Sequence, residues 1–164
     1  MSETANVDMD IVGPVLGRVP SGIFILTVRQ GEEETGMLAS WVMQAGFEPP
    51  AVTVAVKKGR YVADWLDAGA TFALNVVTED GKTLLGHFGR GFEPAQPAFE
   101  GLEIERTDDG LPLLTEGTLG QLICKPVSHV DSGDHRIYLA NIVDGRVRNE
   151  DAPMVHVRKS GTHY

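Results

Sequence analysis

Short apolar runs separated by turn-forming residues are the main pattern of this 164-residue chain. Residues 23–29, 71–77 and 136–143 are rich in β-branched and aromatic side chains, which strands favour. Residues 51–56 are almost wholly apolar, which is typical of a strand buried on both faces. Further strand candidates are residues 113–114, 119–127, 146–148 and 154–158. With turn signals about every 8 to 12 residues, the pattern predicts about seven or eight short strands.

Two or three short helices are predicted between these strands. Residues 9–17 and 61–67 are helix candidates, and a third begins at an N-cap formed by Asp80 and ends at Phe88. Alternating strand–helix–strand units are missing from the pattern. The chain is therefore predicted to be mainly β, as a closed or nearly closed antiparallel barrel rather than an α/β sheet.

The connections between strands carry their own signals. Residues 30–35 contain three glutamates, which indicate a solvated hairpin tip before a returning strand over residues 36–42. Asp144 and Gly145 predict a tight turn between two strands. Residues 89–102 mix glycine, proline and phenylalanine with charges and are predicted to be a long loop. Such loops usually cover a site or an interface.

Length and composition indicate one domain, residues 11–164, behind a flexible arm formed by residues 1–10. A transmembrane helix needs about 18 or more consecutive apolar residues, and the sequence has no such run. The acidic N-terminus does not resemble a signal peptide, and the single Cys124 allows no internal disulfide. These features predict a soluble cytoplasmic protein that is not a membrane protein. The net charge of −9 argues against nucleic acid as a partner.

Several familiar motifs are missing. The sequence has no GxGxxG fingerprint, no GxSxG elbow and no HExxH motif. The five histidines do not follow the spacings of metal ligands, so no metal site is predicted. Cys124 lies in an apolar, strand-like run, which favours a buried structural thiol over a nucleophile.

Two polar stretches remain open to more than one interpretation. The cationic loop Lys57-Lys58-Gly59-Arg60 follows a buried strand and precedes a helix, a place where a phosphate can be held. It is equally compatible with a solvated turn. Residues 131–135 also read as a turn, and they place His135 beside carboxylates at the start of a strand. That imidazole is either a turn residue or a group that titrates near neutrality and contacts a cofactor.

The motifs taken in order resemble the flavin reductase-like, FMN-binding split-barrel family over nearly the whole chain. They are PSGIFILT at 20–27, GMLAS at 36–40, FEPP at 47–50, FALNV at 72–76, HF at 87–88 and GDH at 133–135. A narrower resemblance, to the flavin reductase domain of cyanobacterial-type flavodiiron proteins, rests on residues 37–45, 54–60, 87–92 and 156–164. The family implies an antiparallel split barrel of Greek-key type, with a few short peripheral helices. It also implies non-covalent FMN, NAD(P)H as co-substrate and a homodimer.

The resemblance also implies roles for particular residues. Met37, Leu38, Ala39, Ser40 and Trp41 would line the edge of the isoalloxazine ring. Val56, Lys57, Lys58 and Arg60 would lie near the phosphate and ribityl, and His87, Phe88 and Arg90 would close the phosphate side. His135 would be the catalytic residue that faces the nicotinamide. Tyr164 and residues 158–163 would pack over the site.

This chain departs from many free-standing reductases of the family at Leu38 and Trp41, where those proteins have Thr and Ser. The first hypothesis is an NAD(P)H:flavin oxidoreductase that transfers a hydride to FMN, which demands no acid–base pair because the cofactor supplies the chemistry. The second is an FMN-binding electron-transfer module that serves a partner protein. The third is a non-enzymatic split-barrel protein that binds another ligand, such as haem.

Overall fold

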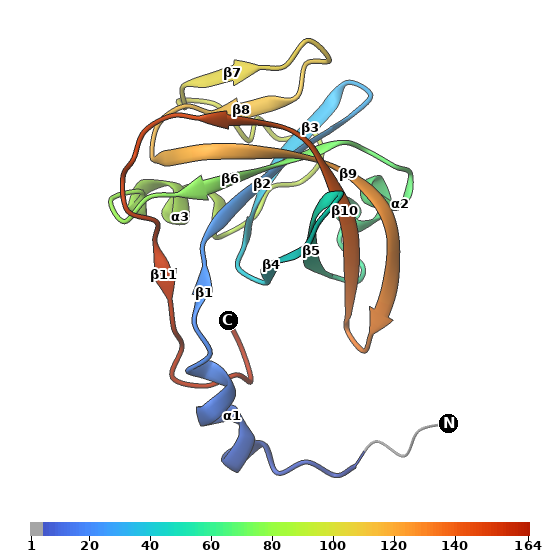
Figure 1. Ribbon diagram of the computed structural model, residues 1–164, viewed down its shortest axis with the longest axis vertical. Coiled ribbons are helices and arrows are strands. Elements are labelled where there is room, and N and C mark those ends of the chain that lie inside the picture. The colour runs from blue at the N-terminus through green and yellow to red at the C-terminus, as the bar shows by residue number, and fades with distance from the viewer. Residues whose placement is uncertain (1–4) are drawn as a thin grey trace.

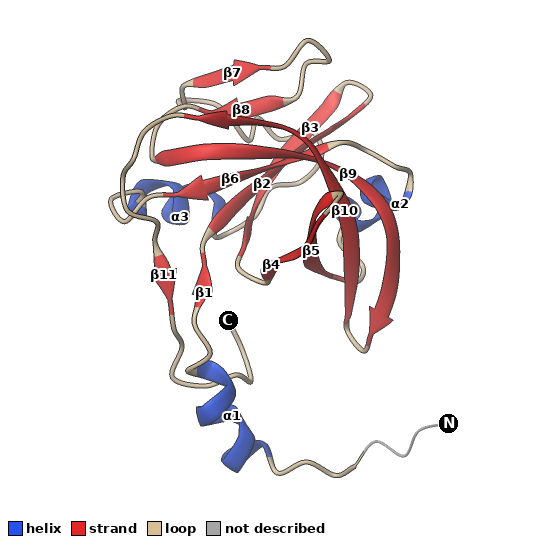
Figure 2. Ribbon diagram, in the orientation of Figure 1, coloured by secondary structure: helices blue, strands red, loops and turns tan. Residues whose placement is uncertain are grey.

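The computed structural model describes residues 5–164, which are mainly β with three short helices (Figure 2). In chain order the elements are α1 (Met9–Gly17), β1 (Ser21–Gly22), β2 (Phe24–Gln30), β3 (Glu33–Ala39), β4 (Val42–Phe47), β5 (Pro50–Lys57), α2 (Tyr61–Asp67), β6 (Phe72–Val77), α3 (Lys82–Phe88), β7 (Ile104–Arg106), β8 (Pro112–Leu114), β9 (Thr118–Ser132), β10 (His135–Val147) and β11 (Val155–His156). Of these strands, the pattern did not predict β1, β4 or β7.

Seven strands form one antiparallel sheet in the order β3-β2-β6-β9-β10-β5-β4 (Figure 1). The two edges of this sheet are β3 and β4, yet only Ser40 and Trp41 separate them in the chain. The sheet must therefore curl until its two edges come close together. At Trp41 the chain leaves β3 and joins β5, where the Ala55 N–H donates to the Trp41 carbonyl at 3.0 Å. The predicted antiparallel split barrel is confirmed.

Two apolar clusters cover the two faces of the central strands. Successive side chains of a strand point to opposite faces, so Leu26 of β2 enters one cluster and Ile25 enters the other. The first cluster fills the barrel and includes Leu66 of α2. The second lies under α3, which contributes Leu84 and Phe88. Because both faces of β2 are covered, apolar side chains stand at consecutive positions, as in Phe24-Ile25-Leu26, rather than at alternating ones.

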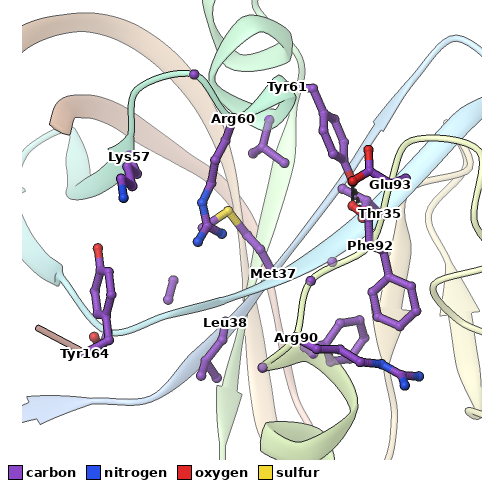
Figure 3. A pocket seen from close by; sticks show the side chains of 18 of the residues that line it. Thr35, Met37, Leu38, Lys57, Arg60, Tyr61, Arg90, Phe92, Glu93 and Tyr164 are labelled. Carbon is purple, nitrogen blue, oxygen red and sulfur yellow. Dashed lines mark hydrogen bonds between the residues drawn. The ribbon is translucent and has the colours of Figure 1, made fainter. Parts of the chain in front are cut away.

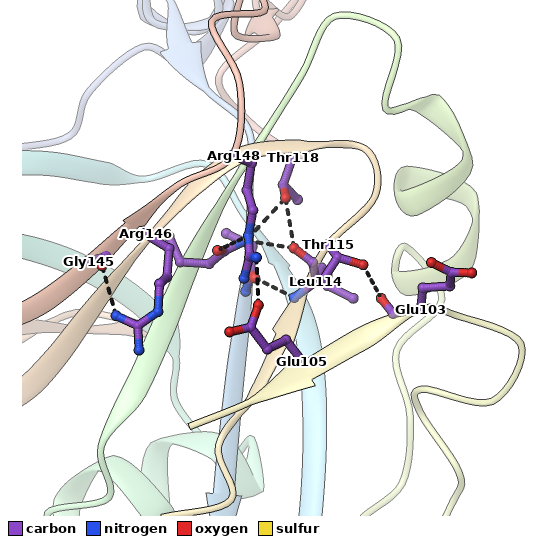
Figure 4. Close-up of polar contacts among 10 residues, drawn as sticks. Glu103, Glu105, Leu114, Thr115, Thr118, Gly145, Arg146 and Arg148 are labelled. Carbon is purple, nitrogen blue, oxygen red and sulfur yellow. Dashed lines mark hydrogen bonds and ion pairs between the residues drawn. The ribbon is translucent and has the colours of Figure 1, made fainter. Parts of the chain in front are cut away.

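A buried polar network holds the β7–β8 end of the barrel (Figure 4). The Gln121 amide donates to the Leu114 carbonyl at 2.6 Å and to the Thr118 hydroxyl at 3.1 Å. Its oxygen accepts from Nε of Arg148 at 3.0 Å, and Nη1 of that arginine lies 2.6 Å from the Glu105 carboxylate. Polar side chains far apart in sequence are thus paired with one another, and they fix β7 and β8 to the main sheet.

The predicted helices are present, and two of them have the predicted bounds. The predicted N-cap at Asp80 is wrong, because Gly81 occupies that position and no side chain caps α3. The returning strand ends at Ala39 rather than at residue 42, since the chain crosses there to the other edge of the sheet.

The predicted turn at Asp144 and Gly145 is also wrong. Both residues lie inside β10, where a register shift against β9 between Ile142 and Asp144 marks a β-bulge. Glycine and aspartate suit a bulge within a long strand as well as they suit a turn. Local sequence alone therefore did not distinguish the two.

Helix α1 stands apart from the barrel, below it in Figure 1, and begins after the N-cap Asp8. The predicted arm of residues 1–10 overlaps the start of this helix, and residues 1–4 lie outside the described residues. Within residues 5–164, none of the helices combines the length and apolarity that crossing a membrane requires.

Candidate functional site

A cavity of about 690 Å³ lies beside the split of the barrel. Its walls are the second half of β3, the β5–α2 loop, the loop after α3, and Tyr164 (Figure 3). The predicted site residues that line it are Met37 to Trp41, Lys57, Arg60, Phe88, Arg90 and Tyr164. Its volume lies within the range of small-molecule sites, about 300–1,000 Å³. Segments far apart in the chain thus meet at one concave surface.

Strand β3 offers backbone groups to this cavity because it is an edge of the sheet. Among the described residues its only strand partner is β2. In an antiparallel pair, every second residue of an edge strand directs its N–H and C=O away from that partner. The side chains of Met37 and Ala39 are buried in the barrel, while Leu38 packs against the cluster under α3. The edge of β3 therefore presents fixed donors and acceptors, which suit the heteroatoms along one edge of a flat ring.

The β5–α2 loop brings two cations to the cavity. Lys57 ends β5 and Arg60 precedes α2, and Arg60 extends across the cavity toward Met37 (Figure 3). Between them Gly59 has a φ of +84°, a left-handed conformation that glycine adopts without strain. Arg90 lies on the far side of the cavity, on the loop after α3 (Figure 3). An anionic ligand group therefore meets positive charge from the β5–α2 loop, whereas the Arg90 guanidinium lies 5.8 Å from the centroid of the Phe92 ring.

Two predicted neighbours of these cations lie elsewhere. The side chain of Lys58 turns away from the cavity, and its Nζ lies 3.2 Å from the Asp131 carboxylate on the β9–β10 hairpin. Val56 is fully buried in the core of the barrel. Successive side chains of an extended segment point to opposite sides, so Lys57 alone of the three lines the cavity.

Tyr61 connects the loop after α3 to the edge strand. Its hydroxyl bonds to the Thr35 hydroxyl at 2.9 Å and to the Phe92 carbonyl (Figure 3). Burial raises the pKa of the Tyr61 phenol above its ordinary value. The phenol therefore stays protonated near neutrality and keeps the loop beside the cavity.

His87 lies beneath that same loop instead of lining the cavity. Its Nε2 is 2.6 Å from the Ala98 carbonyl, and its ring packs on Phe88 and Phe92. The contacts position the loop that carries Arg90. His87 was predicted to close the phosphate side of the site. In the structure it supports the loop and does not line the cavity.

An aromatic cluster of Trp41, His135 and Tyr164 closes one end of the cavity. The ring of Trp41 lies 4.7 Å from that of His135 and 5.3 Å from that of Tyr164. Nδ1 of His135 is 2.8 Å from the Asp134 carboxylate, and its Nε2 bonds to the Tyr164 hydroxyl. The hydrogen bond from His135 lowers the pKa of the Asp134 carboxyl. A neutral imidazole that donates through Nδ1 accepts the Tyr164 hydroxyl through Nε2.

His135 itself is only 7% exposed and does not line the cavity.

Cys124 is fully buried as predicted, and burial raises the pKa of its thiol to about 12. Within residues 5–164, no three His, Cys, Asp or Glu side chains gather as metal ligands do.

Sequence reasoning missed several residues of the cavity wall. They include Thr35, Gly59, Tyr61, Phe92, Glu93 and Gln96. The long loop over residues 89–102 was predicted to cover a site, and this region was correctly identified. Its individual wall residues carried no separate signal, because their placement depends on the bond between Tyr61 and Phe92.

Comparison with known proteins gives a consistent picture. The family described as "Flavin reductase like domain" matches residues 16–163. Two diflavin flavoproteins A of Synechocystis sp. are 39% and 36% identical to the chain over 166 residues. These matches cover 99% and 100% of this chain but only 28% and 29% of those proteins. The chain therefore spans under a third of the length of the curated relatives that it matches.

Solved structures agree with the family match. The NADH:FAD oxidoreductase SgcE6 of Streptomyces globisporus superposes with a TM-score of 0.80 at 26% identity. The alignment covers 88% of this chain and 85% of that one. The same protein in complex with NAD and FAD fragments superposes with a TM-score of 0.77, also at 26% identity and with the same coverage of both chains.

Proposed function

The chain belongs to the flavin reductase-like domain family, and we propose that it is an oxidoreductase that binds FMN non-covalently in the cavity beside the split barrel. We further propose that NAD(P)H is the hydride donor. A bound flavin supplies the redox chemistry by accepting a hydride from the reduced nicotinamide. The protein supplies binding, orientation and exclusion of water. The curated relatives are diflavin flavoproteins, which supports a flavin as the ligand.

One observation carries this proposal: the cavity combines an open strand edge with separate cations. The edge of β3 from Met37 to Ser40 fits the polar edge of an isoalloxazine ring, which needs fixed donors where negative charge develops. Lys57 and Arg60 lie where a phosphate group can meet them. The cavity volume of about 690 Å³ accommodates a ligand of this size.

The residues then have distinct roles. Backbone groups of β3 orient the ring, while Lys57 and Arg60 hold the phosphate end. The aromatic cluster of Trp41, His135 and Tyr164 closes the end of the cavity where the nicotinamide would stack. Substitution His135→Ala is expected to slow reduction by NAD(P)H more than it weakens FMN binding. The reverse ranking would make His135 a flavin contact.

An absorption spectrum of the purified protein before and after addition of NADH or NADPH tests the proposal. Bleaching of bound flavin at a rate well above that of free flavin is the expected result. Parallel titrations with FMN and FAD decide between the two flavins, since the neighbour SgcE6 is named for FAD. Nucleotide oxidation no faster than with free FMN would contradict the reductase assignment.

A second candidate function is favoured by the length of the relatives. In the diflavin flavoproteins this sequence corresponds to only 28–29% of a longer chain. A domain of that kind would pass electrons to a redox partner, and would retain FMN tightly with poor turnover on pyridine nucleotide alone. Measuring flavin retention on gel filtration together with NADH turnover separates the two candidates.

We also propose a homodimer. The exposed apolar side chains of α1, such as Ile11 at 69% and Val15 at 70% exposure, support an interface there. Light scattering coupled to gel filtration measures the mass directly. A monomer at micromolar concentration would contradict this proposal.

A further inference from the structure

The nicotinamide end of the cavity is already filled by a residue of this chain. His135 is the side chain expected to face the nicotinamide, yet its Nε2 is bonded to the Tyr164 hydroxyl. The Tyr164 ring packs against Trp41, with ring centroids 5.3 Å apart. A second aromatic ring placed beside Trp41 and His135 would occupy the position that Tyr164 already fills.

The backbone of the segment that carries Tyr164 is anchored to α1. The Arg158 N–H donates to the Gly17 carbonyl at 2.7 Å, and the Gly161 N–H donates to the Gly13 carbonyl at 2.7 Å. Gly13 and Gly17 lie on one face of α1, four residues apart. This face is what allows residues 158–161 to approach the helix closely.

The approach leaves no room for a side chain on that face. A Cβ on Gly17 would lie 2.6 Å from the carbonyl carbon of Ser160, and one on Gly13 would lie 2.9 Å from the Ser160 hydroxyl. The first contact is with backbone, so the segment itself would have to move. We therefore expect a substitution at Gly17 to displace Tyr164, although Gly17 itself does not line the cavity.

The attachment of Tyr164 to the cavity is light enough to be reversible. The residue remains 68% exposed, although it contacts both Trp41 and His135. Arg158 adds a guanidinium 5.6 Å from the centroid of the Trp41 ring, and its Nη1 donates to the His163 carbonyl at 2.7 Å. One hydrogen bond and two aromatic pairs hold an exposed ring, so a ligand with a larger ring surface can displace it.

We propose that Tyr164 is a displaceable plug that occupies the nicotinamide position beside Trp41 and His135. The pyridine nucleotide and Tyr164 compete for one surface, so the apparent affinity for the nucleotide equals the intrinsic affinity multiplied by the fraction of molecules that are unplugged. This inference rests on the proposed function for the identity of the competing ring. It also gives a structural reason for the poor turnover with pyridine nucleotide alone that the second candidate function predicts.

The test uses the full chain loaded with flavin and measures two quantities. Calorimetry with NAD⁺, which transfers no hydride to the flavin, reports binding at the nicotinamide position. Stopped-flow absorbance with NADH reports flavin reduction. The variants are Tyr164→Ala, which removes the plug, Tyr164→Phe, which keeps the ring without the hydrogen bond, and Gly17→Ala, which moves the supporting segment. Gly86→Ala is the matched control, because this helical glycine has open space around its Cβ position.

We expect Tyr164→Ala to bind NAD⁺ about tenfold more tightly than the unaltered protein, which corresponds to about 1.4 kcal/mol. Gly17→Ala should shift NAD⁺ affinity in the same direction, Tyr164→Phe by a smaller factor, and Gly86→Ala not at all. Flavin affinity should change less than NAD⁺ affinity in every variant. Agreement between Tyr164→Ala and Gly17→Ala would show that the site is closed by where the Tyr164 ring lies, since Gly17→Ala moves the ring without changing it.

The outcomes separate the plug from the proposed function. Unchanged or weaker NAD⁺ binding by Tyr164→Ala would overturn the plug, because Tyr164 would then be idle or part of the nucleotide-binding surface. Tighter NAD⁺ binding without flavin reduction in any variant would support the plug and contradict the reductase assignment. Absence of NAD⁺ binding in all variants would overturn both.

Discussion

The guanidinium groups of Arg148 and Arg60 have opposite surroundings. Arg148 lies in the network at the β7–β8 end, bonded to Gln121 and to Glu105. Arg60 extends into the cavity, and within residues 5–164 neither Arg60 nor Lys57 has a salt-bridge partner. A buried charge must be paired inside the protein, whereas an exposed charge remains available for a ligand.

The difference indicates which polar groups maintain the fold and which are available for binding. The network at the β7–β8 end satisfies the carbonyl of Leu114 and the amide of Gln121 through contacts within the chain. The cavity instead presents a strand edge and cations toward solvent. Substitutions in the network should therefore reduce stability with little effect on flavin. Substitutions of the cavity cations should do the reverse.

The largest expected effect comes from breaking the network with Gln121→Ala. This side chain is 2% exposed, and its removal leaves Nε of Arg148 without its partner. It also takes one of two donors from the Leu114 carbonyl, which keeps the Thr118 hydroxyl at 2.8 Å. We expect the free energy of unfolding to fall by about 4 kcal/mol, because a buried group left unpaired costs about 1–3 kcal/mol, more when it is charged, and the deleted side chain leaves a cavity. Urea denaturation measures the loss. The exposed Gln44→Ala is the matched control, and an equal loss there would remove the distinction between the two regions.

The second effect is on binding, through Lys57→Ala combined with Arg60→Ala. We expect flavin affinity to fall by about 3 kcal/mol, roughly a hundredfold, since charge-assisted hydrogen bonds contribute about 1.5–3 kcal/mol each. Fluorescence titration with FMN gives the dissociation constant, and the midpoint of unfolding should hardly move. Lys125→Ala, an exposed cation on β9, serves as the charge control.

Lys58→Ala tests whether this lysine contacts the flavin phosphate, as the sequence suggested, or pairs with Asp131, as in the structure. The sequence placed Lys58 near the phosphate, whereas the structure pairs it with Asp131 at 3.2 Å. We expect flavin affinity to change by less than about 1 kcal/mol, as for an exposed ion pair. A loss as large as that of the Lys57 and Arg60 pair would contradict the orientation of this loop.

A fourth prediction concerns pH and the barrel interior. Burial raises the pKa of the Cys124 thiol from 9.0 to about 12, so the folded state keeps a proton that the unfolded chain loses. This contribution to stability is complete below pH 9 and is lost as the pH rises from 9 toward 12. At pH 10 the loss should be about 1.4 kcal/mol, which corresponds to one pKa unit.

Comparing urea unfolding of the unaltered protein and Cys124→Ala at pH 8 and pH 10 isolates this contribution. The variant should lose less stability over that interval, because other titrating groups are common to both proteins. Identical losses would mean that the thiol is not held protonated by burial.

The smallest effect on stability is expected from Tyr61→Phe, which loosens one wall of the cavity. Its hydroxyl holds the loop after α3 through Thr35 and the Phe92 carbonyl. We expect a loss of about 1 kcal/mol in stability, the net value of a typical hydrogen bond. Hydrogen exchange should be faster in residues 89–97 and unchanged in β6. Faster exchange throughout the barrel would show that Tyr61 supports the fold and not the loop alone.

Much of the fold followed from the sequence, because local patterns decide local structure. The helices at residues 9–17 and 61–67 were predicted with their bounds, and the strands β2, β5 and β6 were predicted closely. The bulge near Asp144 was not predicted, since a turn and a bulge use the same residues. The crossing after Ala39 was also missed, because a strand that changes partners keeps an apolar sequence on both sides of the change.

The candidate site divides in the same way. Met37 to Trp41, Lys57, Arg60 and Arg90 were predicted from ordered motifs, and they do line one cavity. The sequence placed Lys58 and His87 there too, whereas the structure turns Lys58 toward Asp131 and pairs Nε2 of His87 with the Ala98 carbonyl. Side-chain direction within a loop depends on what the loop packs against, and no local pattern records that.

The sequence by itself determined the family, the β-rich class of the chain and the segments that meet at the site. Strand periodicity, turn residues and ordered motifs are properties of neighbouring residues, and they survive without any knowledge of packing. Tertiary structure alone decided that β3 is an open edge, that Gly13 and Gly17 hold the segment carrying Tyr164, and that this ring rests on His135. Those contacts join residues 29 or more positions apart or depend on which strand has no neighbour, and such facts exist only when the sheet has curled into a barrel.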